Sequence, residues 1–77
     1  MNYTLTELLS VNFILISDEG KYPKFTDKLC QLIKVKSSEF YTLKLCNSDY
    51  KGIYKIHPEY TSTIKAYTFN DYPERFL

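Results

Sequence analysis

Short runs of β-forming residues, separated by turn signals, dominate the chain between residues 12 and 68. The first run, NFILIS at residues 12–17, is rich in β-formers and too short for a buried helix. Gly, Pro, Asn, Asp and Ser gather between the runs, where they favour turns. The pattern predicts five short strands, at residues 12–17, 28–36, 40–46, 52–56 and 62–68.

A short helix is expected before the first strand. Thr4-Leu5-Thr6-Glu7 matches a capping box, in which the Thr side chain accepts a backbone hydrogen bond and the Glu side chain reaches back. The 77 residues suffice for one domain and leave no room for a second core. We therefore expect a single, mainly β domain, with a helix at residues 4–10, a β-barrel at residues 12–68 and a tail at residues 69–77.

His57-Pro58 interrupts the end of the fourth run. Pro58 has no N–H to donate, so it cannot continue a central strand. A tight 3₁₀ turn over residues 57–60 would join the last two strands. The order of parts (strand, long loop, hairpin, loop, strand, 3₁₀ turn, strand) resembles the SH3-like barrel. The residues that carry this resemblance are GIYKIHPEY at positions 52–60.

The resemblance implies a five-stranded SH3-like barrel and extends no further than the fold. The long loop lacks the Ala-Leu-Tyr-Asp-Tyr motif of signalling SH3 domains, and Glu39-Phe40 stands where those domains show Trp. Both features line the groove that binds proline-rich peptides, so that binding function is not implied. The fold itself hosts many unrelated functions.

Two registers are open for the central hairpin. A three-residue loop places Cys30 opposite Cys46, whereas a two-residue loop places Cys30 opposite Leu45 and Lys36 opposite Glu39. Both faces of the hairpin carry apolar residues, so the pattern does not choose between them. In either register we expect the two cysteines to be reduced thiols that pack as small apolar groups.

Lysines are concentrated in the β-rich part of the chain. Residues 28–68 hold seven Lys and three carboxylates, whereas residues 1–27 hold two Lys and four carboxylates. The simpler interpretation is that these lysines lie on outward strand positions and prevent sheet edges from pairing with other chains. The alternative is a strip that binds a nucleic-acid backbone, formed by Lys34, Lys36, Lys44 and Lys55. The net charge of only +1 and the single Arg favour the first interpretation.

Aromatic residues are the strongest indication of function. The chain has eight Tyr and five Phe, and several fall in predicted loops, in the turn or in the tail. Because Tyr is enriched at protein interfaces, this subset predicts a contact patch for another protein. The members are Tyr22, Phe25, Tyr50, Tyr60, Tyr72 and Phe76. The alternative is that the rings pack across the barrel and expose only the hydroxyl.

The sequence shows no Gly-rich phosphate loop, no nucleophile–base motif, no paired catalytic carboxylates and no Cys-x-x-Cys spacing. His57 is the only His and is expected to be a turn residue. We therefore expect a protein that is not an enzyme and has no metal and no cofactor. The first residues lack a cationic segment, and no apolar run could span a membrane, so we expect a cytoplasmic protein with no membrane contact.

These features predict a small interaction protein that binds, and inhibits or modulates, a host macromolecule. The small size, the frequent Lys, Ile, Asn and Tyr, and the lack of a catalytic motif resemble small accessory proteins of phages and mobile elements. The alternative is a nucleic-acid-binding module that uses the lysine strip. A third possibility is a homo-oligomer formed through the tyrosines.

Overall fold

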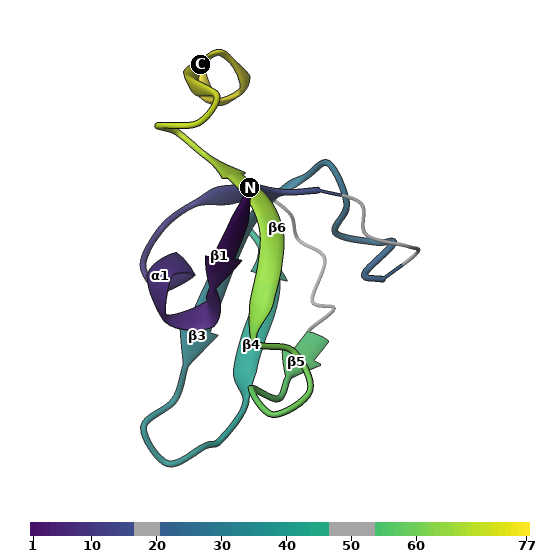
Figure 1. The fold of residues 1–77 in the computed structure, drawn as a ribbon, viewed down its shortest axis with the longest axis vertical. Coiled ribbons are helices and arrows are strands. Elements are labelled where there is room, and N and C mark those ends of the chain that lie inside the picture. The colour runs from purple at the N-terminus through teal and green to yellow at the C-terminus, as the bar shows by residue number, and fades with distance from the viewer. Residues whose placement is uncertain (17–20, 47–53) are drawn as a thin grey trace.

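The computed structural model describes residues 1–16, 21–46 and 54–77. In this part of the chain the fold is mainly β, with six antiparallel strands and one short α-helix (Figure 1). The strands are β1 (Asn2–Thr4), β2 (Phe13–Leu15), β3 (Leu29–Lys34), β4 (Tyr41–Leu45), β5 (Tyr54–Ile56) and β6 (Thr63–Thr68). The helix α1 covers Leu5–Leu8, and the 3₁₀ helix η1 covers Pro73–Phe76 in the tail.

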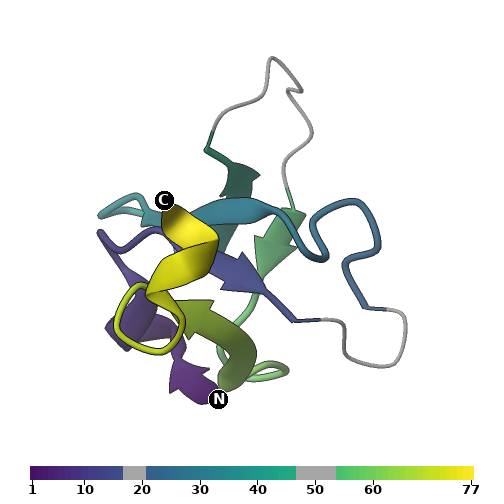
Figure 2. The same ribbon diagram turned by 90° about the horizontal axis from the view of Figure 1, so that it is seen from above.

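The strands form one curled sheet in the order β1-β6-β2-β3-β4-β5. Seen along the long axis, they curve into a half-barrel around the core (Figure 2). Alternate side chains face inward, as strand geometry requires. The core comprises Leu5, Leu8, Phe13, Leu15, Phe25, Cys30, Leu32, Leu43, Ile56, Ile64 and Ala66. It draws on every strand except β1, so its formation depends on contacts between distant parts of the chain.

The predicted strands are present as β2 to β6, with shorter bounds than predicted. Residues 52 and 53 of the fourth predicted strand lie outside the described residues. The sixth strand, β1, was not expected. Its three residues NYT carry no alternating pattern, and the strand exists because it pairs with β6, with Tyr3 opposite Ile64.

The capping box at the start of α1 is confirmed. The Glu7 N–H donates to Thr4 Oγ1 at 3.2 Å, and the Thr4 N–H donates to Glu7 Oε1 at 2.9 Å. The helix ends at Leu8, before the predicted boundary, because Leu9 is extended and Ser10 has a left-handed φ of 64°. Leu9 instead forms an isolated parallel bridge with Leu32 of β3.

The hairpin of β3 and β4 adopts one of the two open registers. Cys30 lies opposite Leu45, and Leu32 lies opposite Leu43. The other register would set Leu32 against Lys44 and turn this lysine toward the core, which the buried Leu32–Leu43 pair avoids. The three-residue loop is therefore wrong. The ladder ends at the pair of Lys34 and Tyr41, so the connection is also wider than the two-residue loop.

The turn predicted around Pro58 is confirmed. The His57 carbonyl accepts hydrogen bonds from the N–H groups of Tyr60 and Thr61, both at 3.0 Å. Because Pro58 stands second in this turn, its missing N–H is not needed. The turn connects β5 to β6 across the end of the half-barrel.

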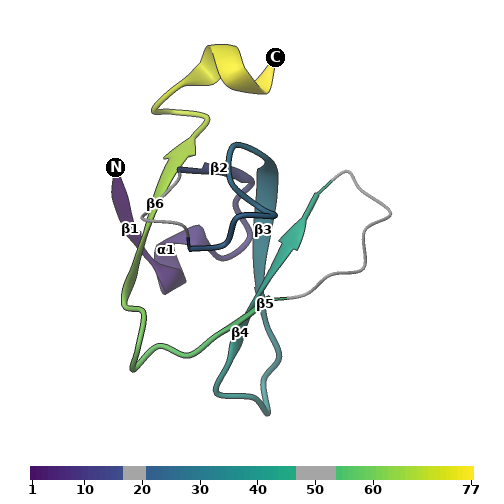
Figure 3. The ribbon, with the colours of Figure 1, turned by 90° about the vertical axis from the view of Figure 1, so that its right-hand side faces the viewer.

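The tail projects from the end of the molecule opposite the β3–β4 hairpin (Figure 3). A carboxylate fixes its base, because Asp71 Oδ2 accepts from the Thr68 N–H at 3.0 Å, from the Thr68 hydroxyl at 3.1 Å and from the Tyr3 hydroxyl. The Thr68 N–H, followed by the Tyr3 hydroxyl, holds the pKa of Asp71 below its usual value. The same bond to Asp71 raises the pKa of Tyr3.

We expect this anchor to fail in acid and in the Asp71→Ala variant. A carboxyl group whose pKa is lower in the folded chain than in the unfolded chain stabilises the folded state at pH values above its unfolded pKa. This stabilisation is lost as the pH falls through the pKa of the folded chain. The Thr68 amide should thus lose its protection from hydrogen exchange below a pH of about 4 in the wild type, and at neutral pH in Asp71→Ala. The exposed Glu74 offers a control, since Glu74→Gln should leave Thr68 protected. Equal protection in Asp71→Ala and the wild type would refute the anchor.

Candidate functional site

The three strands β3, β4 and β5 expose one face away from the core. Residues on this face alternate with the buried ones, so that cross-strand neighbours form rows. Gln31 lies opposite Lys44, while Ile33, Thr42 and Lys55 form the next row across all three strands. Apolar and cationic side chains thus share this outer face.

The apolar character increases toward the hairpin end of the face. Val35 and Phe40 lie just beyond the last pair of the β3–β4 ladder. The centre of the Phe40 ring is 5.1 Å from the centre of the His57 ring. His57 in turn lies 5.5 Å from the Tyr60 ring. The exposed fractions are 37% for Ile33, 59% for Val35, 41% for Phe40 and 85% for Tyr60. We call these four residues and His57 the outer-face patch.

Polar groups border this patch. Lys55 Nζ lies 6.0 Å from the centre of the Phe40 ring, within reach of a cation–π contact. His57 Nε2 lies 3.4 Å from Glu39 Oε2, and the Glu59 N–H donates to His57 Nδ1 at 3.2 Å. The result is an exposed apolar surface bordered by charged side chains.

The predicted aromatic set does not gather on one side of the molecule. Tyr60 is in the outer-face patch, whereas Tyr72 and Phe76 lie in the tail at the opposite end (Figure 3). The Tyr72 ring is 5.7 Å from Tyr67, and the Phe76 ring is 6.0 Å from Phe69. Tyr50 lies outside the described residues. Among the described residues, Tyr60 is therefore separated from Tyr72 and Phe76.

The two aromatic residues of the long loop pack inward. Phe25 is buried in the core, where its carbonyl accepts from the Cys30 thiol, so its ring cannot contact a partner. Tyr22 is half-buried against the core and lies 4.7 Å from the Tyr54 ring in an edge-to-face arrangement. A turn in which the Phe25 N–H donates to the Tyr22 carbonyl folds this part of the loop back onto the sheet.

The four predicted lysines are divided between two faces. Lys44 and Lys55 lie on the outer face, but Lys34 lies on the side of β3 that also carries the buried Cys30 and Leu32, and its Nζ is 5.9 Å from the centre of the Tyr41 ring. Lys36 belongs to the exposed hairpin connection. A continuous strip of all four is therefore not formed.

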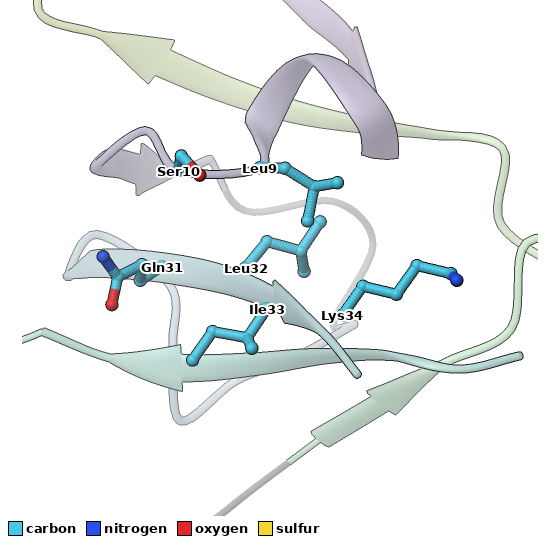
Figure 4. Close-up of a pocket in the computed structure, with 6 residues that line it drawn as sticks. All are labelled: Leu9, Ser10, Gln31, Leu32, Ile33 and Lys34. Atoms are coloured by element: carbon cyan, nitrogen blue, oxygen red, sulfur yellow. The ribbon is translucent and has the colours of Figure 1, made fainter. Parts of the chain in front are cut away.

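A shallow hollow of about 320 Å³ lies between β3 and the residues that follow α1 (Figure 4). Leu9 and Leu32 point toward one another across it, and its remaining lining is Ser10, Gln31, Ile33 and Lys34. Lys34 contributes the single ionisable side chain of this lining, so no acid–base pair faces the hollow. The hollow offers no chemistry that would identify a reaction.

No three His, Cys, Asp or Glu side chains within residues 1–16, 21–46 and 54–77 gather closely enough to hold a metal ion. In the same described ranges, no helix is long and apolar enough to cross a membrane.

The two thiols differ in their surroundings. Cys30 is fully buried and donates to the Lys28 carbonyl at 3.2 Å, and burial raises its pKa to about 12. Cys46 is half-buried, and its thiol lies 3.6 Å from Asn12 Oδ1. Burial raises the pKa of Cys46 as well. Both cysteines are free, as expected from the sequence.

We expect a disulfide reagent at pH 8 to modify Cys46 slowly and to leave Cys30 unmodified in the folded protein. The thiolate is the reacting form, and both burial and a raised pKa suppress it at Cys30. Counting released thiolate with and without denaturant should give one reactive group in the native state and two after unfolding. A Cys46→Ser variant should give none in the native state. Equal labelling rates for both thiols would contradict this packing.

The sequence did not indicate most of the outer-face patch. Of the residues in this patch, only Tyr60 was among those predicted to contact a partner. Ile33, Val35 and Phe40 were assigned to predicted strands or their ends. Their exposure follows from the hairpin register, which the sequence left open.

The chain matches no protein family model, no curated protein and no solved structure.

Proposed function

We propose that this chain is a small, non-catalytic interaction protein that binds another protein through the outer-face patch. The observation that carries the proposal is the exposure of Ile33, Val35, Phe40 and Tyr60 toward the hairpin end of the sheet, where the rings of Phe40 and Tyr60 both contact His57. Exposing apolar and aromatic side chains to water costs free energy. Burying them against a partner is therefore favourable. Phe40 and Tyr60 are the expected anchors, because aromatic residues dominate binding energies at protein interfaces.

We propose that the fold is SH3-like, with β1 and α1 added. The support is the order of elements from β2 to β6, with a long loop after β2, a hairpin of β3 and β4, and a hydrogen-bonded turn between β5 and β6. The added strand β1 lies beside β6 and lengthens the sheet at one edge.

The proposed consequence of binding is inhibition or modulation of a host macromolecule. We propose that the chain acts stoichiometrically, by covering a surface of its partner. The proposal that it is an accessory protein of a phage or mobile element rests on size and composition.

Nucleic-acid binding is the second candidate, and the observation in its favour is that Lys44 and Lys55 share the outer face with exposed rings. Basic and aromatic side chains together suit a single-stranded nucleic acid. The division of the four lysines between two faces makes it the weaker candidate.

Affinity capture from the lysate of the native host, with and without nuclease, tests the two candidates. We expect one protein to be enriched in both samples by the wild type and lost with Phe40→Ala/Tyr60→Ala. Enrichment that disappears with nuclease would overturn the protein-binding proposal in favour of nucleic acid. Recovery of the bait alone, together with a dimer in solution, would point to self-association.

A further inference from the structure

The hydrogen bonds of His57 fix which ring nitrogen carries its proton. Nδ1 accepts from the Glu59 N–H at 3.2 Å, so this nitrogen must present its lone pair. The hydrogen of the neutral ring then lies on Nε2, which faces Glu39 Oε2 at 3.4 Å and donates to it. The neutral imidazole satisfies both neighbours in this arrangement.

The same residue organises the exposed aromatics. Its carbonyl closes the turn by accepting from the N–H groups of Tyr60 and Thr61. The centre of its ring lies 5.1 Å from the centre of the Phe40 ring and 5.5 Å from that of Tyr60. A movement of the His57 ring relative to the turn therefore changes its contacts with both exposed aromatic rings.

We propose that protonation of His57 switches the turn of residues 57–60 and so rearranges the outer-face patch. This deepens the proposed function, because it assigns a pH-dependent regulation to the same surface. Only the consequence for a partner rests on that function; the rearrangement itself is a property of the free chain.

The physical cause is a conflict between two donors. An imidazolium carries hydrogens on both nitrogens, so Nδ1 can no longer accept from Glu59 and instead directs an N–H at the Glu59 N–H. The Nε2–H donor to Glu39 remains and becomes charge-assisted, which holds the ring on the hairpin side. The ring and the Glu59 amide must then separate, and Tyr60 moves with the turn.

Within the described ranges, charged residues near His57 in the fold come from three elements. Glu39 lies in the β3–β4 connection, Lys55 lies on β5 over the Phe40 ring, and Glu59 follows in the turn itself. The Glu39 carboxylate attracts an imidazolium and the Lys55 ammonium repels it. Imidazole is the side chain type that gains its charge between pH 8 and pH 5, so mild acidification is enough to test the switch.

Amide and ring NMR signals of the free ¹⁵N,¹³C-labelled chain between pH 8 and pH 5 test the switch. We expect the Glu59 and Tyr60 amide signals to move with the same midpoint as the His57 ring carbons. The Glu59 amide should lose the downfield position of a hydrogen-bonded proton. The amide of the buried Phe13 should stay in place and show that the fold is intact.

His57→Asn is the matched variant. The Asn side-chain oxygen can accept from the N–H two residues later, as in an Asx turn before Pro, and it does not titrate. The Glu59 and Tyr60 signals should therefore be constant from pH 8 to pH 5 in this variant. Titration of the wild-type His57 ring without movement of the Glu59 amide would overturn the switch, as would equal movement in His57→Asn. Failure to capture a partner would leave these spectra unaffected, so the two proposals fail separately.

Discussion

Replacing Phe13 with Ala is expected to lower the melting temperature by at least about 12 °C, or to leave the chain unfolded at 25 °C. Phe13 is fully buried on β2, the strand that joins β6 to β3, and it lies opposite Cys30 and Thr68. Truncation of a buried Phe to Ala costs about 3–5 kcal/mol in the free energy of unfolding, because it leaves a cavity. A domain of this length has a total stability of only about 4–12 kcal/mol.

Thermal unfolding followed by circular dichroism measures this loss, and Phe69→Ala is the matched control. Phe69 is the same residue type but is 53% exposed in the tail, so its truncation should change the free energy of unfolding by less than about 1 kcal/mol. Similar melting temperatures for the two variants would mean that β2 does not stand at the centre of the sheet.

Replacing both Phe40 and Tyr60 with Ala is expected to weaken binding to the captured partner at least about 30-fold, since one aromatic hot spot contributes about 2 kcal/mol or more. Both rings lie against His57, so the double variant removes the aromatic part of the patch. Both are also exposed, so the change should leave the folded state intact. Titration calorimetry on the purified pair measures the affinity.

Tyr72→Ala controls for the loss of an exposed ring. Tyr72 has the same exposed fraction as Phe40, 41%, and lies in the tail at the opposite end of the molecule (Figure 3). This variant should bind as tightly as the wild type. Weak binding by Tyr72→Ala and normal binding by the double variant would assign the interface to the tail.

Local chemistry explains what the sequence predicted correctly. The capping box needs only Thr4 and Glu7 three residues apart, and the turn at Pro58 follows from its missing N–H. Strand positions were visible because turn-forming residues separate short β-rich runs. Each of these signals acts over a few residues and is independent of the remaining fold.

What the sequence did not reveal depends on distant contacts. The strand β1 exists through pairing with β6, some sixty residues away, and has no pattern of its own. Both faces of the β3–β4 hairpin carry apolar residues, so only packing of Leu32 against Leu43 in the core selects the register. A shift of one residue would have exchanged the faces and buried Lys44.

The candidate site follows from that register. Once Leu32 and Leu43 face inward, Ile33 must face outward, and Phe40 meets His57 beyond the end of the ladder. An aromatic residue in a predicted loop was a weaker guide, because Phe25 returns to the core. Tyr60 is exposed because it stands in a tight turn with little to cover it.

Hydrogen–deuterium exchange of the chain, alone and bound to the captured partner, tests the outer-face patch most directly. We predict that binding slows exchange at Val35, Phe40 and Tyr60, while exchange in the tail, from Phe69 to Leu77, stays unchanged. Slowed exchange confined to the tail or to β1, with unchanged rates in the hairpin connection and the turn, would contradict it.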